Sequence, residues 1–234
     1  MKKSSFANYN AQWELYGYMQ NVQGAIFDLD GTLLDSMWKW GEIAIDYIKS
    51  HGKTPRPGFL EVLRSFNTTQ EAQYFIDEYA VNLPLEEVIY GRDKLMLDFY
   101  SNDVKLKDGV IPVLELLKNN GVKMCIATAT DRWLIEPALK LHDLNKYFQC
   151  VLTCTEENTS KSNPDIFIRA AAILGSEIKN TLVVEDALYA MKTAKKAGFT
   201  VIGISDESNK DEQDEIINSC DFFCITPGDM LKFL

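Results

Sequence analysis

Residues 24–36 read GAIFDLDGTLLDS. An apolar run ends here in two aspartates, Asp28 and Asp30, and the chain then enters a Gly-Thr turn. A short apolar run bounded by turn residues is typical of a buried strand. Two like charges at its end destabilise each other unless something binds between them. The stretch therefore predicts a buried strand with a ligand site at its carboxyl end.

Strand-like and helix-like segments alternate from residue 107 onward. The expected strands are 122–128, 148–154, 180–186, 199–204 and 221–226, and the expected helices are 106–121, 131–144, 164–175 and 187–198. Apolar strands that alternate with helices form a parallel sheet with both faces covered. Residues 24–30 are a strand of the same kind, set apart from the others. The predicted fold class is therefore α/β, with a Rossmann-like three-layer core around a central parallel sheet.

The segment from residue 36 to 105 has a different pattern, because it contains no clear buried strand. Three of its stretches have helical periodicity, namely 37–52, 68–82 and 84–101. We therefore expect an all-helical domain, 36–105, inserted into an α/β core made of 23–35 and 106–234. Residues 1–22 form an N-terminal extension, whose aromatic side chains we expect to pack against the parent domain.

The composition of the chain indicates which classes of binding partner are not expected. The formal net charge is −10 and no Lys/Arg cluster stands out, so we expect no nucleic-acid or anionic-membrane partner. No apolar run approaches the ~18–20 residues of a membrane span. The five cysteines, an odd number, indicate reduced thiols in a cytoplasmic protein. We expect a monomer, and we interpret the acidic stretch 205–215 as a solvated surface.

Chemically competent side chains stand where the predicted strands end. Ligands of open parallel sheets bind beyond the carboxyl ends of the strands. The residues at these ends are Asp28, Asp30, Thr128, Thr130, Lys161, Glu185 and Asp186. Four carboxylates in one place need a hard cation, and Mg²⁺ takes oxygen ligands together with a substrate phosphate. A lysine and a threonine beside it suit the remaining phosphoryl oxygens.

Each of these residues also has a simpler interpretation. Asp186 stands where the N-cap of the helix 187–198 belongs. Asp28 or Asp30 fits a turn or a helix cap, and Lys161 fits a surface lysine. The coincidence of four strand ends with suitable chemistry in one sheet favours a phosphate and metal site.

The order of these residues resembles the motifs of the haloacid dehalogenase superfamily of phosphotransferases. DLDGTLLDS is similar to its first motif, Thr128 in CIATAT to the second, Lys161 in KSNPDIF to the third, and VVEDA to the fourth. The resemblance covers residues 24–226. It extends to the subgroup with a helical cap after the first motif, which includes members similar to phosphoglycolate phosphatase and β-phosphoglucomutase.

The resemblance implies a mechanism and a set of site residues. Asp28 is implied as the nucleophile that forms an aspartyl-phosphate, and Asp30 as the acid and then the base. The implied Mg²⁺ ligands are Asp28, the backbone carbonyl of Asp30, Asp186, and Glu185 directly or through water. The implied phosphate-binding residues are Thr128, Ala129 and Lys161.

Residue identities also separate the rival reactions of the family. Dehalogenases and phosphonatases of the superfamily lack the second aspartate, whereas Asp30 is present. The phosphoglucomutase branch usually has a histidine twelve residues past the nucleophile, and that position is Trp40. Where many relatives have Gly-Lys-Pro, this chain has SKSNPD. We therefore expect a Mg²⁺-dependent phosphatase of a small phosphorylated metabolite. A β-phosphoglucomutase-like transferase and a non-catalytic phosphate-binding protein remain as alternatives.

Overall fold

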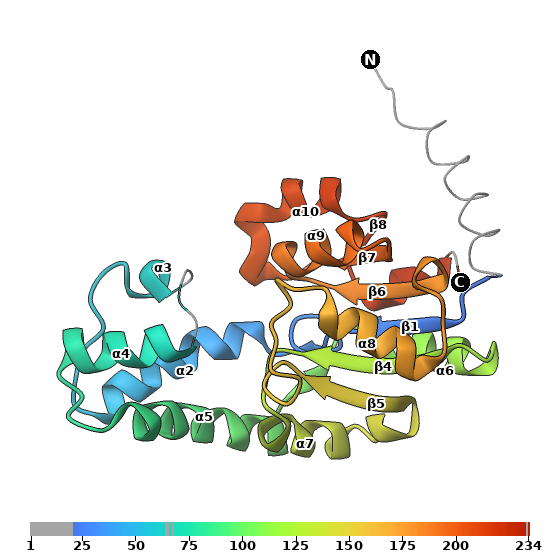
Figure 1. The fold of residues 1–234 in the computed structure, drawn as a ribbon. Helices are drawn as coiled ribbons and strands as arrows, with labels where there is room; N and C mark the ends of the chain where they lie inside the picture. The colour runs from blue at the N-terminus through green and yellow to red at the C-terminus, as the bar shows by residue number, and fades with distance from the viewer. Residues whose placement is uncertain (1–20, 64–65, 67, 233) are drawn as a thin grey trace. The chain divides into compact units, whose positions relative to one another are not determined.

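The computed structural model describes residues 21–63, 66, 68–232 and 234 (Figure 1). The predicted N-terminal extension lies almost wholly outside the described residues. The chain forms two compact units. The first, here the α/β unit, comprises the described residues up to Asp35 together with Lys105–Asp131 and His142–Leu234. The second, the helical unit, comprises Ser36–Val104 and Arg132–Leu141.

A parallel sheet in the order β5-β4-β1-β6-β7-β8 organises the α/β unit. Its strands are β1 (Gly24–Phe27), β4 (Lys123–Thr128), β5 (Phe148–Thr153), β6 (Thr181–Glu185), β7 (Thr200–Ile204) and β8 (Phe222–Cys224). All residues of β1 and β6 are buried, which agrees with their nearly continuous apolar sequences. The predicted α/β fold with a parallel sheet is thus confirmed.

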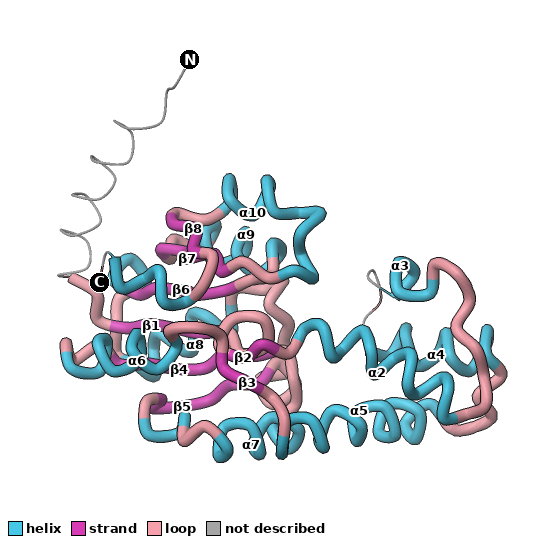
Figure 2. The backbone as a smooth tube through the Cα atoms, turned by 180° about the vertical axis from the view of Figure 1, so that it is seen from behind, coloured by secondary structure: helices cyan, strands magenta, loops and turns pink. Residues whose placement is uncertain are grey.

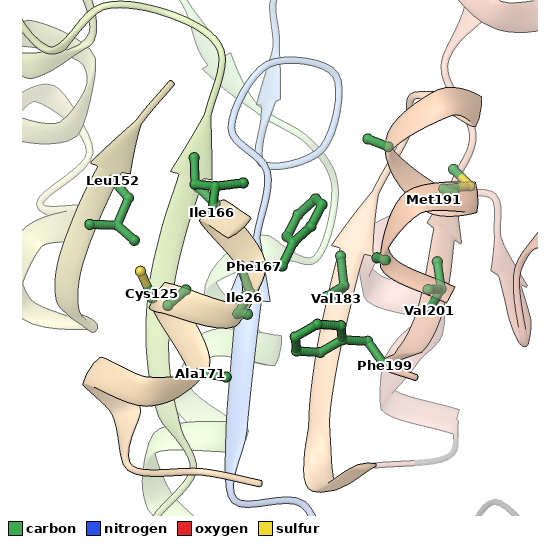
Figure 3. Close-up of a cluster of buried hydrophobic side chains, with 14 of the residues drawn as sticks. Ile26, Cys125, Leu152, Ile166, Phe167, Ala171, Val183, Met191, Phe199 and Val201 are labelled. Carbon is green, nitrogen blue, oxygen red and sulfur yellow. The ribbon is translucent and has the colours of Figure 1, made fainter. Parts of the chain in front are cut away.

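Helices cover both faces of this sheet (Figures 1 and 2). One face carries α8 (Asp165–Leu174) and α9 (Leu188–Lys196), and the opposite face carries α6 (Val110–Asn119). Figure 3 shows the apolar cluster beneath α8 and α9, which includes Phe167, Met191 and strand residues such as Ile26. This packing holds the strand ends in place.

The helical unit contains α2 (Met37–Ser50), α3 (Phe59–Leu63), α4 (Thr68–Tyr79), α5 (Leu85–Asn102) and α7 (Arg132–Leu141). Its core includes Tyr47, Phe59 and Phe75, and the rings of Tyr47 and Phe59 each stack on the ring of Phe75. We assigned α7 to the α/β core from sequence, but it groups with the helical unit. The ring stacking of Tyr90 in α5 on Trp133 in α7 belongs to this packing.

Two short strands bracket the insertion of the helices. β2 (Leu34–Asp35) pairs antiparallel with β3 (Lys105–Leu106), so the outgoing and returning chain segments are hydrogen-bonded to each other.

The acidic stretch 205–215, which we interpreted only as surface, forms the 3₁₀ helix η3 (Glu207–Glu212) and the start of α10 (Gln213–Ser219). The other 3₁₀ helices are η1 (Leu144–Lys146), η2 (Ile178–Asn180) and η4 (Pro227–Lys232). Among the described residues, no helix has the length and apolar character that crossing a bilayer requires.

Candidate active site

Asp28 directly follows β1 and stands beside the end of β6. The ladder between the two strands pairs Phe27 with Val184, and the Asp28 N–H donates to the Val184 carbonyl at 2.9 Å. This register brings Asp28 next to Glu185, although the two residues are far apart in sequence. Both carboxylates are buried. The parallel pairing of β1 and β6 therefore builds the centre of the site.

The turn after β1 carries Asp30 on a tightly hydrogen-bonded loop. Gly31 has a φ of 85°, a left-handed conformation that glycine adopts without steric cost. Its N–H donates to the Leu34 carbonyl at 2.9 Å, which closes the turn. The Asp30 carboxylate is buried and accepts a hydrogen bond from Thr130 Oγ1 at 2.8 Å. The side chain that the resemblance implies as acid and base is thus held by a hydroxyl from the loop after β4.

Lys161 comes from the loop between β5 and α8, and only 3% of it is exposed. Its ammonium Nζ donates to Glu185 Oε2 at 2.8 Å and to Asp28 Oδ1. Burial opposes the charged form of this amine, but the two carboxylates outweigh that effect and raise its pKa above the usual value. The simpler interpretation of Lys161 as a surface lysine is therefore wrong.

Glu185 and Asp186 precede α9, but their side chains do not cap this helix. The N-cap of α9 is Ala187, and no side chain caps it. The backbone N–H groups of Asp186 and Ala187 instead donate to Glu185 Oε1, each at 3.2 Å. Asp186 accepts from Thr32 Oγ1 at 3.3 Å and from Asn209 Nδ2 at 2.9 Å. Helix capping therefore does not explain Asp186.

The site carries more negative than positive charge. Burial and the neighbouring Asp28 charge raise the pKa of Glu185 to about 7. Burial and the charges of Asp28 and Glu185 likewise raise the pKa of Asp186 well above its usual value. Oxygen atoms of these three acids lie within 4.8 Å of one another. Buried oxygens with an excess of negative charge are the donor set that suits a hard divalent cation.

Thr128 ends β4 and is buried at the same edge of the sheet. Its hydroxyl oxygen accepts a hydrogen bond from the Thr130 N–H at 3.1 Å. Ala129, between them, is exposed. This short loop therefore carries a hydroxyl and an accessible residue beside the acidic cluster.

Two contacts of the acidic cluster have no counterpart in the sequence analysis. Thr32 stands in the first motif, but its hydroxyl was not predicted to contact the acids. Asn209 stands in the stretch interpreted as solvated surface. Asn209 is 23 residues from Asp186, and no local pattern announces their contact. Only a hydrogen-bonding residue after β7, a strand that adjoins β6, could have suggested it.

The model of the family described as haloacid dehalogenase-like hydrolase matches residues 25–204. The chain belongs to this family. Its relatives include the phosphoglycolate phosphatase of Rhodobacter capsulatus, 28% identical over 214 residues, or 87% of this chain and 94% of that one. The pyrophosphatase PpaX of Anoxybacillus flavithermus is 24% identical over 197 residues, or 79% and 84% of the two chains.

Solved structures share the fold of this haloacid dehalogenase-like hydrolase. CbbY from Rhodobacter sphaeroides, solved in complex with phosphate, superposes with a TM-score of 0.76. That match covers 91% of this chain and 99% of CbbY at 17% sequence identity. At an identity this low, the match shows only that the two proteins share a fold.

Proposed function

We propose that the protein is a Mg²⁺-dependent phosphatase that hydrolyses a small phosphomonoester through an aspartyl-phosphate. The observation that carries the proposal is the double ion pair of Lys161, from the loop after β5, with Asp28 and Glu185 at the ends of β1 and β6. A buried lysine that contacts the nucleophile suits a reaction in which negative charge approaches a carboxylate. The phosphoglycolate phosphatase among the relatives supports a small phosphomonoester as substrate, and the pyrophosphatase supports phosphate release by hydrolysis more generally.

In the proposed first step, an Asp28 carboxylate oxygen attacks phosphorus while the bond from phosphorus to the leaving oxygen breaks. Asp30, in its acid form, gives its proton to the leaving alkoxide. In the second step, water attacks phosphorus, Asp30 takes a proton from that water, and the bond from Asp28 to phosphorus breaks. The Thr130 hydrogen bond to Asp30 supports this role, since it restricts the carboxylate to one orientation.

The phosphoryl oxygens need donors, and we assign this role to Lys161, Thr128 and the backbone of Ala129. Asp28, Glu185, Asp186 and the Asp30 carbonyl would hold Mg²⁺, which supplies positive charge to the transferring phosphoryl group. The fit rests on the clustering of buried acidic oxygens and on the raised pKa values of Glu185 and Asp186.

The residue at position 40 favours hydrolysis over the mutase alternative, in which the phosphoryl group is returned to a sugar phosphate instead of to water. Trp40 offers an indole N–H, which donates but neither takes up nor releases protons near neutral pH. The Arg92 guanidinium lies over the Trp40 ring, 4.9 Å from its centroid. This contact gives the tryptophan a packing role within the helical unit.

The direct test measures phosphate release from p-nitrophenyl phosphate with Mg²⁺, with and without EDTA, for the natural chain and for Asp28→Asn. Release that needs both the metal and Asp28 supports the proposal. Metal-independent release that is unchanged in Asp28→Asn contradicts it. A panel of phosphorylated metabolites, compared by kcat/KM, then identifies the substrate.

A mutase is tested separately with β-glucose 1-phosphate and a bisphosphate activator. If glucose 6-phosphate accumulates faster than free phosphate, the protein is a mutase rather than a phosphatase. We further propose a cytoplasmic protein, because all five cysteines are free thiols and such thiols persist in reducing compartments. We also propose that the protein is a monomer. Size-exclusion chromatography with light scattering tests the monomer.

A further inference from the structure

Asn209 lies in η3, at the partly exposed edge of the acidic cluster. Its amide Nδ2 donates to Asp186 Oδ2 at 2.9 Å and to the Asp186 backbone carbonyl at 3.2 Å. Both bonds reach the same residue, so the amide fixes the carboxylate relative to its own backbone. We propose that Asn209 is a positioning residue that orients Asp186 and so sets the affinity of the site for a divalent cation. This inference rests on the proposed function, because it takes Asp186 as a metal ligand.

The turn that carries Asn209 is itself anchored to the α/β unit. Asp206 is the N-cap of η3 and accepts from the Ser208 N–H at 3.0 Å and from Ser208 Oγ at 2.7 Å. The other oxygen of Asp206 pairs with Lys107 Nζ at 2.7 Å, and this ammonium also donates to the Ser205 carbonyl at 2.7 Å. Asn209 therefore reaches Asp186 from a short turn that is capped at its start and held by a lysine.

Asp186 needs such a partner because its surroundings repel it. Asp28 and Glu185 are like charges within the same buried cluster, and each disfavours a nearby Asp186 carboxylate. Thr32 contacts the other carboxylate oxygen at the longer distance of 3.3 Å. Among the contacts of the described residues, loss of Asn209 would leave the carboxylate with this longer hydrogen bond. Mutation of a residue that orients a metal ligand typically lowers metal affinity or activity by about 10–100-fold.

A purely structural role for Asn209 predicts a different result. If the amide only tied η3 to the sheet, its loss would lower stability and leave cation affinity unchanged. The two roles are separated by measuring cation affinity and thermal stability on the same variants. Asn218 provides a matched control, because its Nδ2 also donates to a backbone carbonyl, that of Asp214 at 2.7 Å, but within α10.

The experiment titrates the full chain with Mn²⁺ and follows the free ion by electron paramagnetic resonance, without substrate. The variants are Asn209→Ala, Asn209→Leu, which keeps the volume without a donor, Asn218→Ala and Asp186→Asn. We expect both Asn209 variants to raise the Mn²⁺ dissociation constant about tenfold or more. We expect Asn218→Ala to match the natural chain. Melting temperatures in EDTA verify that each variant is folded.

A second readout is the Mg²⁺ dependence of hydrolysis. In the Asn209 variants the half-saturating Mg²⁺ concentration should rise in parallel with the Mn²⁺ dissociation constant, while kcat at saturating Mg²⁺ recovers. If a folded Asn209 variant binds Mn²⁺ within fivefold of Asn218→Ala, the inference is overturned while the proposed function stands. If the natural chain and Asp186→Asn bind Mn²⁺ equally, the proposed metal site itself is wrong.

Discussion

Lys161 Nζ lies 2.8 Å from Glu185 Oε2, and the same ammonium group contacts Asp28. The three residues come from the ends of β1 and β6 and from the loop after β5, and all are buried. One amine thus compensates part of the charge of two buried carboxylates. The consequences of removing this charge are measurable.

Replacing the amine should affect both activity and stability. Lys161→Met keeps most of the side-chain volume but leaves two buried carboxylates without their cation. Breaking a buried pair in this way costs about 3–5 kcal/mol, and we expect phosphate release to fall about 10³-fold because charge stabilisation is lost. Urea unfolding in EDTA and steady-state kinetics measure the two effects.

The matched control is Lys195→Met, which removes a half-exposed pair with Asp221 at 3.2 Å. Exposed pairs contribute about 0–1 kcal/mol, so this variant should stay close to the natural chain in both assays. Equal losses in the two variants would contradict a special role for Lys161.

Asp28→Asn should abolish turnover without unfolding the protein. The amide keeps the shape of the side chain but is a poor nucleophile, so phosphate release should fall at least about 10⁴-fold. The change also removes a like charge beside Glu185 and Asp186. We therefore expect the free energy of unfolding in EDTA to stay within about 1 kcal/mol of the natural chain. Rapid acid quenching followed by mass spectrometry should find a phosphoryl group on the natural chain and none on Asp28→Asn.

The Thr130 hydroxyl should matter for the chemical step. Thr130→Val removes the 2.8 Å hydrogen bond to Asp30 and keeps the branched shape. We expect kcat to fall about 10–100-fold with little change in KM, because proton transfer contributes about 10²–10⁴-fold and the carboxylate is only misoriented. Thr130→Ser, which retains the donor, should recover most of the rate. A Thr130→Ser variant as slow as Thr130→Val would point to packing of the lost methyl group instead.

Cation binding should stabilise the folded chain. The acidic cluster is assembled only by the fold, so Mg²⁺ binds the folded state and contributes about 2.7 kcal/mol at a concentration 100 times its dissociation constant. Differential scanning fluorimetry should therefore show a higher melting temperature with Mg²⁺ than with EDTA. Asp186→Asn should lose most of this increase, and an undiminished increase would exclude Asp186 as a ligand.

A pair of glycines tests the packing of α6 against the C-terminal segment. Gly109 and Gly121 both have positive φ, 84° and 75°. A Cβ on Gly109 would lie 2.6 Å from Gly228 N, whereas a Cβ on Gly121 would meet nothing within 4 Å. Gly121→Ala should cost about 1 kcal/mol from its left-handed conformation alone. Gly109→Ala should cost clearly more, and equal unfolding midpoints in urea would disprove the close approach.

The local pattern of the sequence was enough for most elements of the α/β unit. Helix α8 begins after Pro164 and ends at Gly175, whose φ of 66° is the left-handed conformation expected of a terminating glycine. The apolar run before Asp28 became β1, although the strand ends at Phe27. Such features depend on residues that are close in the sequence, so the sequence pattern is enough to predict them. The motifs of the sequence also indicated the family to which the chain belongs.

Tertiary structure decided against the simpler interpretations of Asp186 and Lys161. From sequence, Asp186 fitted a helix cap and Lys161 a surface lysine. Asp186 is not the cap, because the N-cap of α9 is Ala187 and the Asp186 carboxylate instead accepts from Thr32 and Asn209. The lysine is buried because the loop after β5 turns it toward the end of β1. Neither outcome is local, since each depends on strands that are adjacent in the sheet and distant in the chain.

The sequence by itself determined the alternation of strands and helices, the acidic strand end at Asp28 and Asp30, and the order of the motifs. Periodicity and turn chemistry act over a few residues, and these features need nothing more. Only the tertiary structure decided that Asn209 contacts Asp186 and that α7 joins the helical unit. Sheet order and helix packing bring such partners together, because burial of apolar faces selects neighbours by shape rather than by distance along the chain.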